Sequence, residues 1–332
     1  MRDLGGAMQQ AAAELVAQWE APIPILACHL HFLRDVGTDL LDSPYGALRS
    51  LFRRVKLRPA LRPLARDLGC KLGPEITRAR QAVLQWQQGD DGTQRLPDGQ
   101  AGPATVRALV QWVLDYAADA TGDGMPFDRP YLDLYERCHK THRARAAFLR
   151  TPPSDRKVCR AARRLQRILA PLHRDLPCAP MVRQLQTRTR LFDQLRDALR
   201  LTSSRDTRRR AAGAPTDSPS PQVAELNDIR AALDRFTAAR AAQRPARAPA
   251  QDTRTAIDLI LDHLARPGDH LWGHVISLPA RAGGGIRLVE RTNNLIEGFF
   301  HTGKHAERRR SGRKILTSDM ACLPPPPCSP SI

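Results

Sequence analysis

The chain has 332 residues, and its 52 Lys and Arg outnumber its 34 Asp and Glu, so the formal net charge is +18. Such a charge is unusual for a metabolic enzyme and predicts a polyanionic partner, while an aromatic content of only 5% argues against a surface that stacks the bases of single strands. No apolar run approaches the ~18 residues of a membrane span, no charged-then-apolar leader is seen, and seven irregularly spaced Cys do not suggest disulfides, so we expect a cytoplasmic protein without a membrane partner.

The N-terminal residues predict a helix, then a strand, then a second helix. Apolar side chains mark one face of residues 4–19, Pro22 ends that helix, and the apolar run 23–28 is the best strand candidate in the chain. The run leads into a helix start in which Cys28 and His31 have Cys-x-x-His spacing. Because no second Cys/His pair has suitable spacing, packing at this strand-to-helix junction is favoured over half of a zinc site.

The middle of the chain, residues 43–202, has almost entirely helical patterning. Turn signals interrupt it at 89–102, 121–130, 151–153 and 177–180. Apolar residues spaced by three and four over 158–172 and over 182–199 predict two helices that pair as an antiparallel, coiled-coil-like hairpin. Asp123 and Asp128 are better explained by turn chemistry than by a calcium loop, because the alternating ligands of such a loop are missing.

Two segments of the C-terminal half lack an apolar period. Residues 203–222 are rich in Ser, Pro, Ala and Arg, so we predict a flexible loop there and a second one near 240–252. Helices are predicted on either side of the second loop, at 223–236 and 257–264. The three glycines at 283–285 predict a turn, which a short extended piece follows.

Residues 290–314 combine a helix start with dense basic charge. Asn294 can cap the helix and place Glu297 at its N3 position, where a carboxylate closes a capping box. Intervals of four, three and four put one stripe of side chains on this helix: Glu297, His301, Lys304 and Arg308. Ser311 and Gly312 are expected to end it.

Six bases lie within eleven residues of this stretch, with only Glu307 opposing them. They are Lys304, Arg308, Arg309, Arg310, Arg313 and Lys314. We interpret them as DNA-binding residues that contact phosphates and position DNA without reading its sequence. Bases in the predicted loop at 205–210 could add a nonspecific electrostatic tether.

Three segments, MRDLGGAMQQA, CHLHFLRDVGTDLL and ERTNNLIEGFFHTGKHAERRRSGRK, resemble the catalytic core of DDE-type transposases of the RNase H-like superfamily. The similarity is to the group with a Cys-x-x-His motif and a long helical insertion before the last Glu. It implies a mostly α fold: an incomplete RNase H-like α/β core, its first strands missing, with a large all-helical insertion. The implied division is a partial core at 1–45, an insertion at 46–278, a final core segment at 279–319 and a disordered Pro-rich tail at 320–332.

The resemblance also implies a chemistry. In that family three acidic residues hold two Mg²⁺ or Mn²⁺ ions, which activate water and then a DNA 3′-hydroxyl for attack on phosphodiesters. Glu297 takes the place of the last catalytic acid, Asp3 could be the second, and Cys28 and His31 fall on the Cys-x-x-His motif. The first catalytic Asp has no counterpart. The expected function is therefore a truncated, inactive transposase of a mobile element that keeps DNA binding but does not hold the metal ions productively.

Other interpretations stay open on the residues alone. Glu297 is also explained as a capping carboxylate and Asp3 as an N-cap or a frayed terminal residue. The chain would then be a helical DNA- or RNA-binding regulator without catalytic ancestry, or a basic scaffold that binds a protein through the 158–199 hairpin. DNA is the expected partner, together with a second copy of the chain or a complementing N-terminal transposase fragment, and DNA binding would place the cytoplasmic protein at the nucleoid. The transposase interpretation puts Glu297 beside the strand at 23–28.

Overall fold

The computed structural model describes residues 26–69, 80, 83, 103–118, 120, 122–148, 156–174, 178–201, 223–246, 250–272, 274–277, 280, 284–289, 291, 308–309 and 312. Several predictions lie outside these residues, among them the helix at 4–19 with most of the strand at 23–28, the turns at 89–102 and 151–153, the flexible loop at 203–222, most of the helix at 290–314 and the Pro-rich tail.

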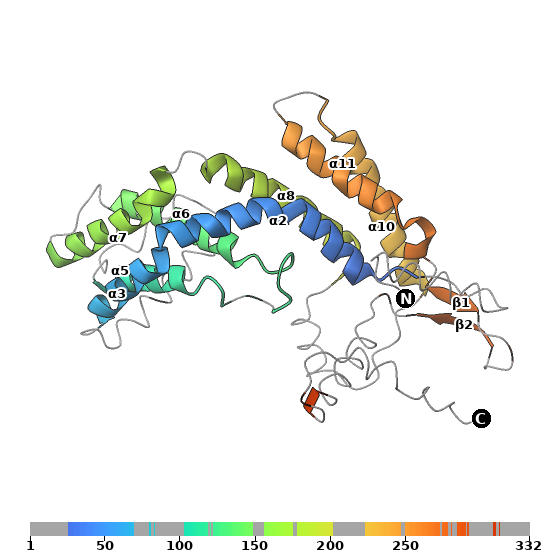
Figure 1. The fold of residues 1–332 in the computed structure, drawn as a ribbon, viewed down its shortest axis with the longest axis horizontal. Coiled ribbons are helices and arrows are strands. Elements are labelled where there is room, and N and C mark those ends of the chain that lie inside the picture. The colour runs from blue at the N-terminus through green and yellow to red at the C-terminus, as the bar shows by residue number, and fades with distance from the viewer. Residues whose placement is uncertain are drawn as a thin grey trace. The chain divides into compact units, whose positions relative to one another are not determined.

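The chain is mostly helical, as predicted (Figure 1). In order, the elements are α2 (His29–Val55), α3 (Leu57–Gly69), α5 (Pro103–Leu114), α6 (Pro130–Phe148), α7 (Arg156–Arg174), α8 (Cys178–Ala198), α10 (Val223–Ala242), α11 (Gln251–Ala265), the 3₁₀ helix η1 (Gly268–Leu271), β1 (Val275–Ser277) and β2 (Ile286–Leu288). They fall into two compact units, the first formed by residues 1–32 with 267–332 and the second by 33–266. Of the second loose segment expected at 240–252, residues 240–242 and 251–252 are helical, whereas the described residues 243–246 and 250 are not.

The second unit is built around two sets of packed helices. α7 packs against α3, α5 and α6, whereas α8 packs mainly against α10 and α11. The apolar positions predicted on both helices are buried, among them Leu165 on α7 and Phe192 on α8. The predicted hairpin of α7 with α8 is nevertheless wrong: each apolar stripe is covered by other helices, because a period of three and four specifies a buried face but not the element that covers it.

Charged contacts join helices inside this unit. The Arg129 guanidinium donates to both oxygens of Asp193, at 3.0 and 2.9 Å, and to the carbonyl of Pro126 at 3.1 Å. Both bonds to Asp193 come from Nη2, and the Arg129 side chain is only 13% exposed, so this ion pair is partly withdrawn from water. His263 of α11 lies 2.9 Å from Asp39 of α2. Such pairs fix how the helices dock, whereas the apolar contacts supply most of the stabilisation.

The turn before α6 confirms the prediction of turn chemistry at Asp128. The backbone N–H groups of Gly122 and Gly124 both donate to Oδ2 of Asp128, at 2.8 and 3.0 Å. Both glycines have positive φ, at 90° and 72°, which L-side chains rarely adopt. The carboxylate therefore closes the turn on itself and is not held open for a cation.

The first unit contains a short antiparallel hairpin. β1 pairs with β2 in a register that places Val275 opposite Leu288. The predicted turn precedes β2, with Gly284 and Gly285 at φ of 64° and 83°, but β1 was not predicted because three residues are too few for a pattern. The described end of the predicted strand, Leu26–Cys28, forms an isolated bridge at Ala27, whose N–H donates to the backbone carbonyl of His270 at 2.9 Å.

Candidate nucleic-acid interface

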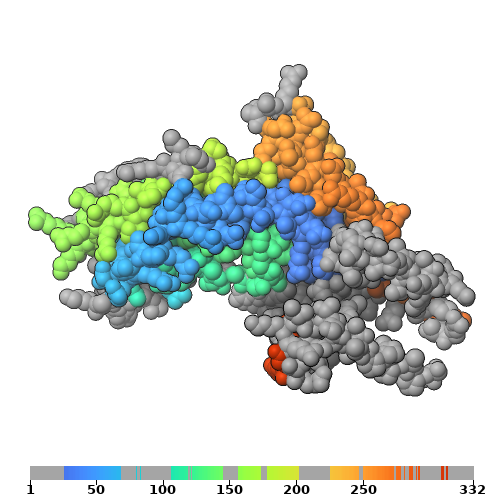
Figure 2. Space-filling model, viewed as in Figure 1, coloured from blue at the N-terminus to red at the C-terminus, as the bar shows by residue number. Residues whose placement is uncertain are grey.

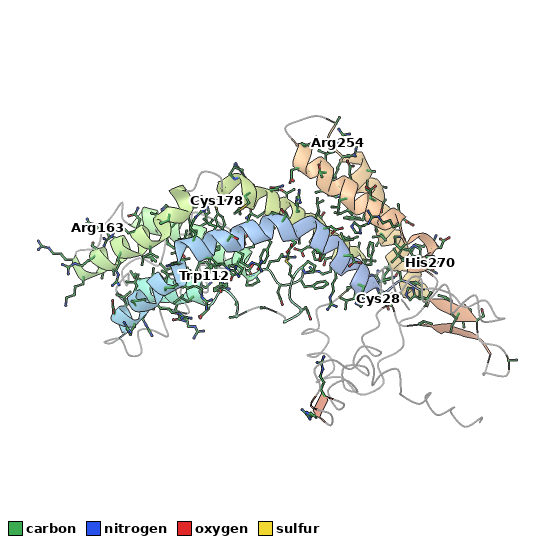
Figure 3. The ribbon with its side chains drawn as sticks, in the orientation of Figure 1. Cys28, Trp112, Arg163, Cys178, Arg254 and His270 are labelled. Atoms are coloured by element: carbon green, nitrogen blue, oxygen red, sulfur yellow. The ribbon has the colours of Figure 1, made fainter. Side chains whose placement is uncertain are left out.

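The Cys-x-x-His motif lies at the start of α2, in the first unit. Cys28 is fully buried, and its carbonyl accepts the N–H of Phe32 at 3.0 Å, which makes it the residue that begins the helix. His31 lies one turn inside the helix and is half-buried. The two side chains thus lie at the junction that the sequence indicated, and the thiol of Cys28 is buried (Figure 3).

His29, between them, is the residue that sequence reasoning missed. Its ring is fully buried; Nε2 lies 2.9 Å from the carbonyl oxygen of Leu271, and Nδ1 lies 3.4 Å from Nη1 of Arg291. One neutral tautomer satisfies both contacts, since Nε2–H donates to the carbonyl while Nδ1 accepts from the guanidinium. The ring also meets Trp272 and His274 edge to face, at centroid distances of 6.0 and 5.0 Å.

Burial keeps this ring neutral. The pKa of His29 is lowered to about 3, chiefly by desolvation; the hydrogen bond to Leu271 raises it in part, and electrostatic interactions with His274 and Arg291 lower it further. The pKa of His274 is likewise lowered to about 4, by burial first and by Arg291 second, against the raising effect of the Leu271 and Ala27 carbonyls. The only signal for this pair in the sequence was the extra His inside the Cys-x-x-His motif.

His274 differs from His29 in its hydrogen bonding. Its ring is fully buried, and within the described part of the chain neither ring nitrogen has a hydrogen-bond partner of good geometry. The backbone carbonyl of the same residue accepts the N–H of Val289 at 2.7 Å, so the main chain is fixed while the ring nitrogens are not satisfied. A buried ring of this kind lowers stability unless it stays neutral.

The described residues do not fit a metal ion. No group of three or more His, Cys, Asp or Glu side chains among them could hold one. At the histidine pair, one ring already binds Leu271 and the guanidinium of Arg291 approaches it, which disfavours a cation. The predicted ligands of Mg²⁺ or Mn²⁺, Asp3 and Glu297, lie outside the described residues.

Two of the six predicted DNA-binding bases are described. Arg308 and Arg309 are helical and exposed. Gly312 has φ of 69°, and its N–H donates to the carbonyl of Arg308 at 2.9 Å, so the helix ends there as the sequence predicted. The other four bases, Lys304, Arg310, Arg313 and Lys314, lie outside the described residues.

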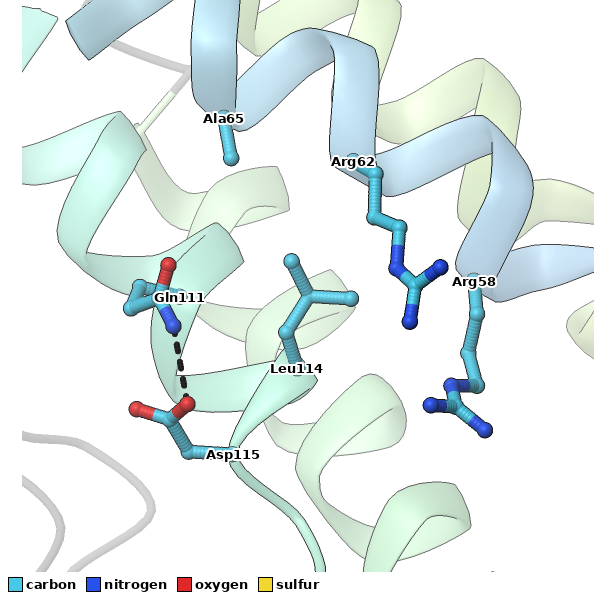
Figure 4. A pocket seen from close by; sticks show the side chains of 6 residues that line it. All are labelled: Arg58, Arg62, Ala65, Gln111, Leu114 and Asp115. Carbon is cyan, nitrogen blue, oxygen red and sulfur yellow. Dashed lines mark hydrogen bonds between the residues drawn. The ribbon is translucent and has the colours of Figure 1, made fainter.

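A pocket of about 350 Å³ lies between α3 and the end of α5 in the second unit (Figure 4). Arg58 and Arg62, one turn apart on α3, face Gln111 and Asp115, which are joined by a hydrogen bond of 2.8 Å. Arg58 also lies over the ring of Tyr116, 5.5 Å from its centre. The lining has one carboxylate and two guanidinium groups but no histidine, serine or cysteine, so the pocket offers mainly charge.

Among the residues that the structure describes, no helix is both long enough and apolar enough to cross a bilayer. Comparison of the chain with protein-family models, with curated protein sequences and with solved structures finds no match.

Proposed function

We propose that this chain derives from a DDE-type transposase and binds DNA through the bases of residues 304–314, without carrying out strand transfer by itself. Mostly helical architecture and a net charge of +18 support the proposal in general terms. The specific support comes from a contact between two segments far apart in the sequence.

The backbone N–H of His29 donates to the carbonyl of Arg291 at 2.9 Å, across 262 residues. It joins the first residue of α2, next to the Cys-x-x-His cysteine, to the chain six residues before Glu297. An RNase H-like core would require this neighbourhood, because its last acid lies beside the strand that precedes the motif. The side chain of His29 strengthens the junction through Leu271.

The predicted lack of activity rests on the number of carboxylates. Two bound Mg²⁺ ions supply the activation of water and of the DNA 3′-hydroxyl in the transposase family. Hard cations of this kind need several oxygen ligands, and the resemblance supplies only Asp3 and Glu297. Because this is one acid fewer than the three of the transposase family, less of the metal charge is compensated. We therefore expect no cleavage by this chain alone.

A helical nucleic-acid-binding regulator is the second candidate, favoured by the near absence of strands from the described residues beyond β1 and β2. Disulfide trapping separates the two. With Glu297→Cys, the proposed core brings the new thiol close to the native Cys28, and a 28–297 disulfide should be found by mass spectrometry after mild oxidation. The regulator interpretation predicts no such disulfide, and Arg309→Cys serves as a control for random collisions.

The proposed DNA binding makes a quantitative prediction. Replacing all six bases of the 304–314 run by Gln should lower the slope of log Kobs against log [salt] by about 5, because each phosphate contact contributes about 0.9. The measurement is duplex binding by fluorescence anisotropy between roughly 50 and 300 mM salt, because the affinity changes steeply over this range. An unchanged slope would contradict the proposal.

Incubation with Mg²⁺ or Mn²⁺ and a terminal-repeat duplex should give no cleavage products on a sequencing gel. Glu297→Ala is the control variant. Cleavage by the parent chain that disappears in this variant would show that a complete catalytic site exists and that the inactivity prediction is wrong.

A further inference from the structure

The helix α7, Arg156–Arg174, is the most strongly polarised element of the second unit. It carries seven bases and no acidic residue, and it contains no Phe, Tyr or Trp. Its charge becomes informative once the structure shows which side of the helix is covered.

Four arginines follow one exposed line of the helix, which we call the α7 arginine row: Arg156, Arg160, Arg163 and Arg167. Their spacing of four, three and four keeps them on one face. Val158 and Leu165 on the opposite face are 1% and 0% exposed, beneath α3, α5 and α6. Because the apolar face is already buried in protein, α7 cannot insert into a lipid surface in the manner of an amphipathic membrane helix.

The charges of the row are not compensated. Within the described part of the chain its four guanidinium groups have no ion-pair partner, whereas the neighbouring Arg164 reaches Asp67 of α3 at 2.8 Å. Some arginines elsewhere in the unit do have carboxylate partners: Arg196 lies 3.2 Å from Asp193, and Arg244 pairs with Asp258. Like charges three and four residues apart destabilise a helix by about 0.2–0.5 kcal/mol per pair. An anionic partner would relieve this repulsion.

The row has the dimensions and chemistry of a surface for a phosphate backbone. At about 1.5 Å per residue, Arg156 and Arg167 are separated by roughly 16 Å along the helix, while duplex DNA carries a phosphate about every 3.4 Å of axis on each strand. Guanidinium groups bind phosphate oxygens in a bidentate manner. A surface for single strands would interleave aromatic rings for stacking, and α7 has none.

We propose that the α7 arginine row binds the sugar–phosphate backbone of duplex DNA, as a contact separate from the 304–314 run. In Figure 2 the surface of α7 (yellow-green) lies beside that of α3 (blue) and is open on the face shown, and Figure 3 shows long side chains extending outward from the helix, where Arg163 is labelled. The choice of DNA as partner rests on the proposed function, but the location on α7 does not.

The test replaces all four arginines of the row by Gln, which has a similar helix propensity, so that α7 stays folded. The slope of log Kobs against log [salt] for duplex binding should fall by about 3 to 4. Replacement of the same four by Lys should keep most of the slope, because the charge remains. Circular dichroism checks that helix content is unchanged in both variants.

A matched control removes four positive charges from paired arginines of the same unit, Arg196, Arg200, Arg244 and Arg254, each of which has an aspartate within 4 Å. This control variant should lower the slope of log Kobs against log [salt] by clearly less than the row variant does. Equal effects of the two variants would overturn the inference, because only net charge would then matter.

The outcomes separate this inference from the proposed function. If the row variant binds duplex DNA like the parent while the 304–314 variant does not, the inference fails and the proposed function stands. If the 304–314 variant keeps the parental slope while the row variant loses it, the row is supported and the proposed C-terminal contact fails. If the row variant no longer binds polyglutamate but binds DNA as the parent does, the row is a protein contact and the inference is overturned.

Discussion

Gly37→Ala should destabilise the second unit by about 3 kcal/mol, the upper end of what overpacking a core usually costs. Gly37 lies in the middle of α2 and is buried. A Cβ placed there would lie 2.2 Å from Cγ and 2.4 Å from Cβ of Pro126, and 2.7 Å from Cε2 of Phe192. Nonbonded carbon atoms do not approach this closely in folded proteins, so the helix or its neighbours must move.

Neither neighbour of Gly37 is free to move. The ring of Pro126 is rigid, and the carbonyl of the same residue accepts a hydrogen bond from Arg129 at 3.1 Å. The ring of Phe192 is fully buried and lies against Phe127 at 5.8 Å between centroids. Relief of the clash therefore requires α2 to shift away from α8 and from the turn before α6, which loses apolar contacts across the unit.

Gly46→Ala is the matched control, on the same helix. Apart from the nearby backbone of α2 itself and the adjacent residues, no atom lies within 4 Å of a Cβ at this position, so the change should stabilise by about 0.5–1 kcal/mol, the usual gain of Ala over Gly inside a helix. Urea unfolding followed by circular dichroism measures both variants. If Gly37→Ala proves as favourable as Gly46→Ala, the packing of α2 against Pro126 described above is wrong.

The first unit should lose stability in mild acid because of His274. The pKa of this residue is lowered from 6.5 to about 4 by burial, so between these values the unfolded chain binds the proton and the folded chain does not. The contribution of this neutral ring to the free energy of unfolding is fully present above about pH 6.5. It falls by about 1.4 kcal/mol for each unit by which the pH is lowered towards 4. His29, with a pKa of about 3, also reduces the free energy of unfolding in acid, and this loss continues down to about pH 3.

His274→Leu tests this assignment. The variant should keep or slightly raise the unfolding free energy at pH 7, because no good hydrogen bond of the ring to a described residue is lost. Its stability should then fall less steeply than that of the parent between pH 6.5 and pH 4. The measurement is urea unfolding at several pH values in this range, and parallel curves for the two proteins would contradict the assignment to His274.

Local patterns predicted the helical parts of this protein well. The apolar period indicated α7, α8, α10 and α11, and the turn chemistry of Asp128 and Gly312 was visible in single residues. Such features depend on neighbours in the sequence, so a short window contains their cause. The α7–α8 hairpin failed because the partner of a helix face depends on the whole chain.

The candidate sites divide in the same way. The basic run near Arg308 is a property of composition, whereas the junction of His29 with Arg291 spans 262 residues and no local pattern announces it. The α7 arginine row lies between these cases: its residues are plain in the sequence, but only burial of the opposite face shows that they form an open cationic surface.

By itself, the sequence determined the helical class, the excess of positive charge, the start of α2 at the Cys-x-x-His motif and the glycine that ends the last helix. The tertiary structure alone decided which apolar faces meet, which arginines have carboxylate partners and which histidines lose water. The physical reason is that helix periodicity and turn formation are local, whereas desolvation and ion pairing depend on atoms that the fold brings together from distant parts of the chain.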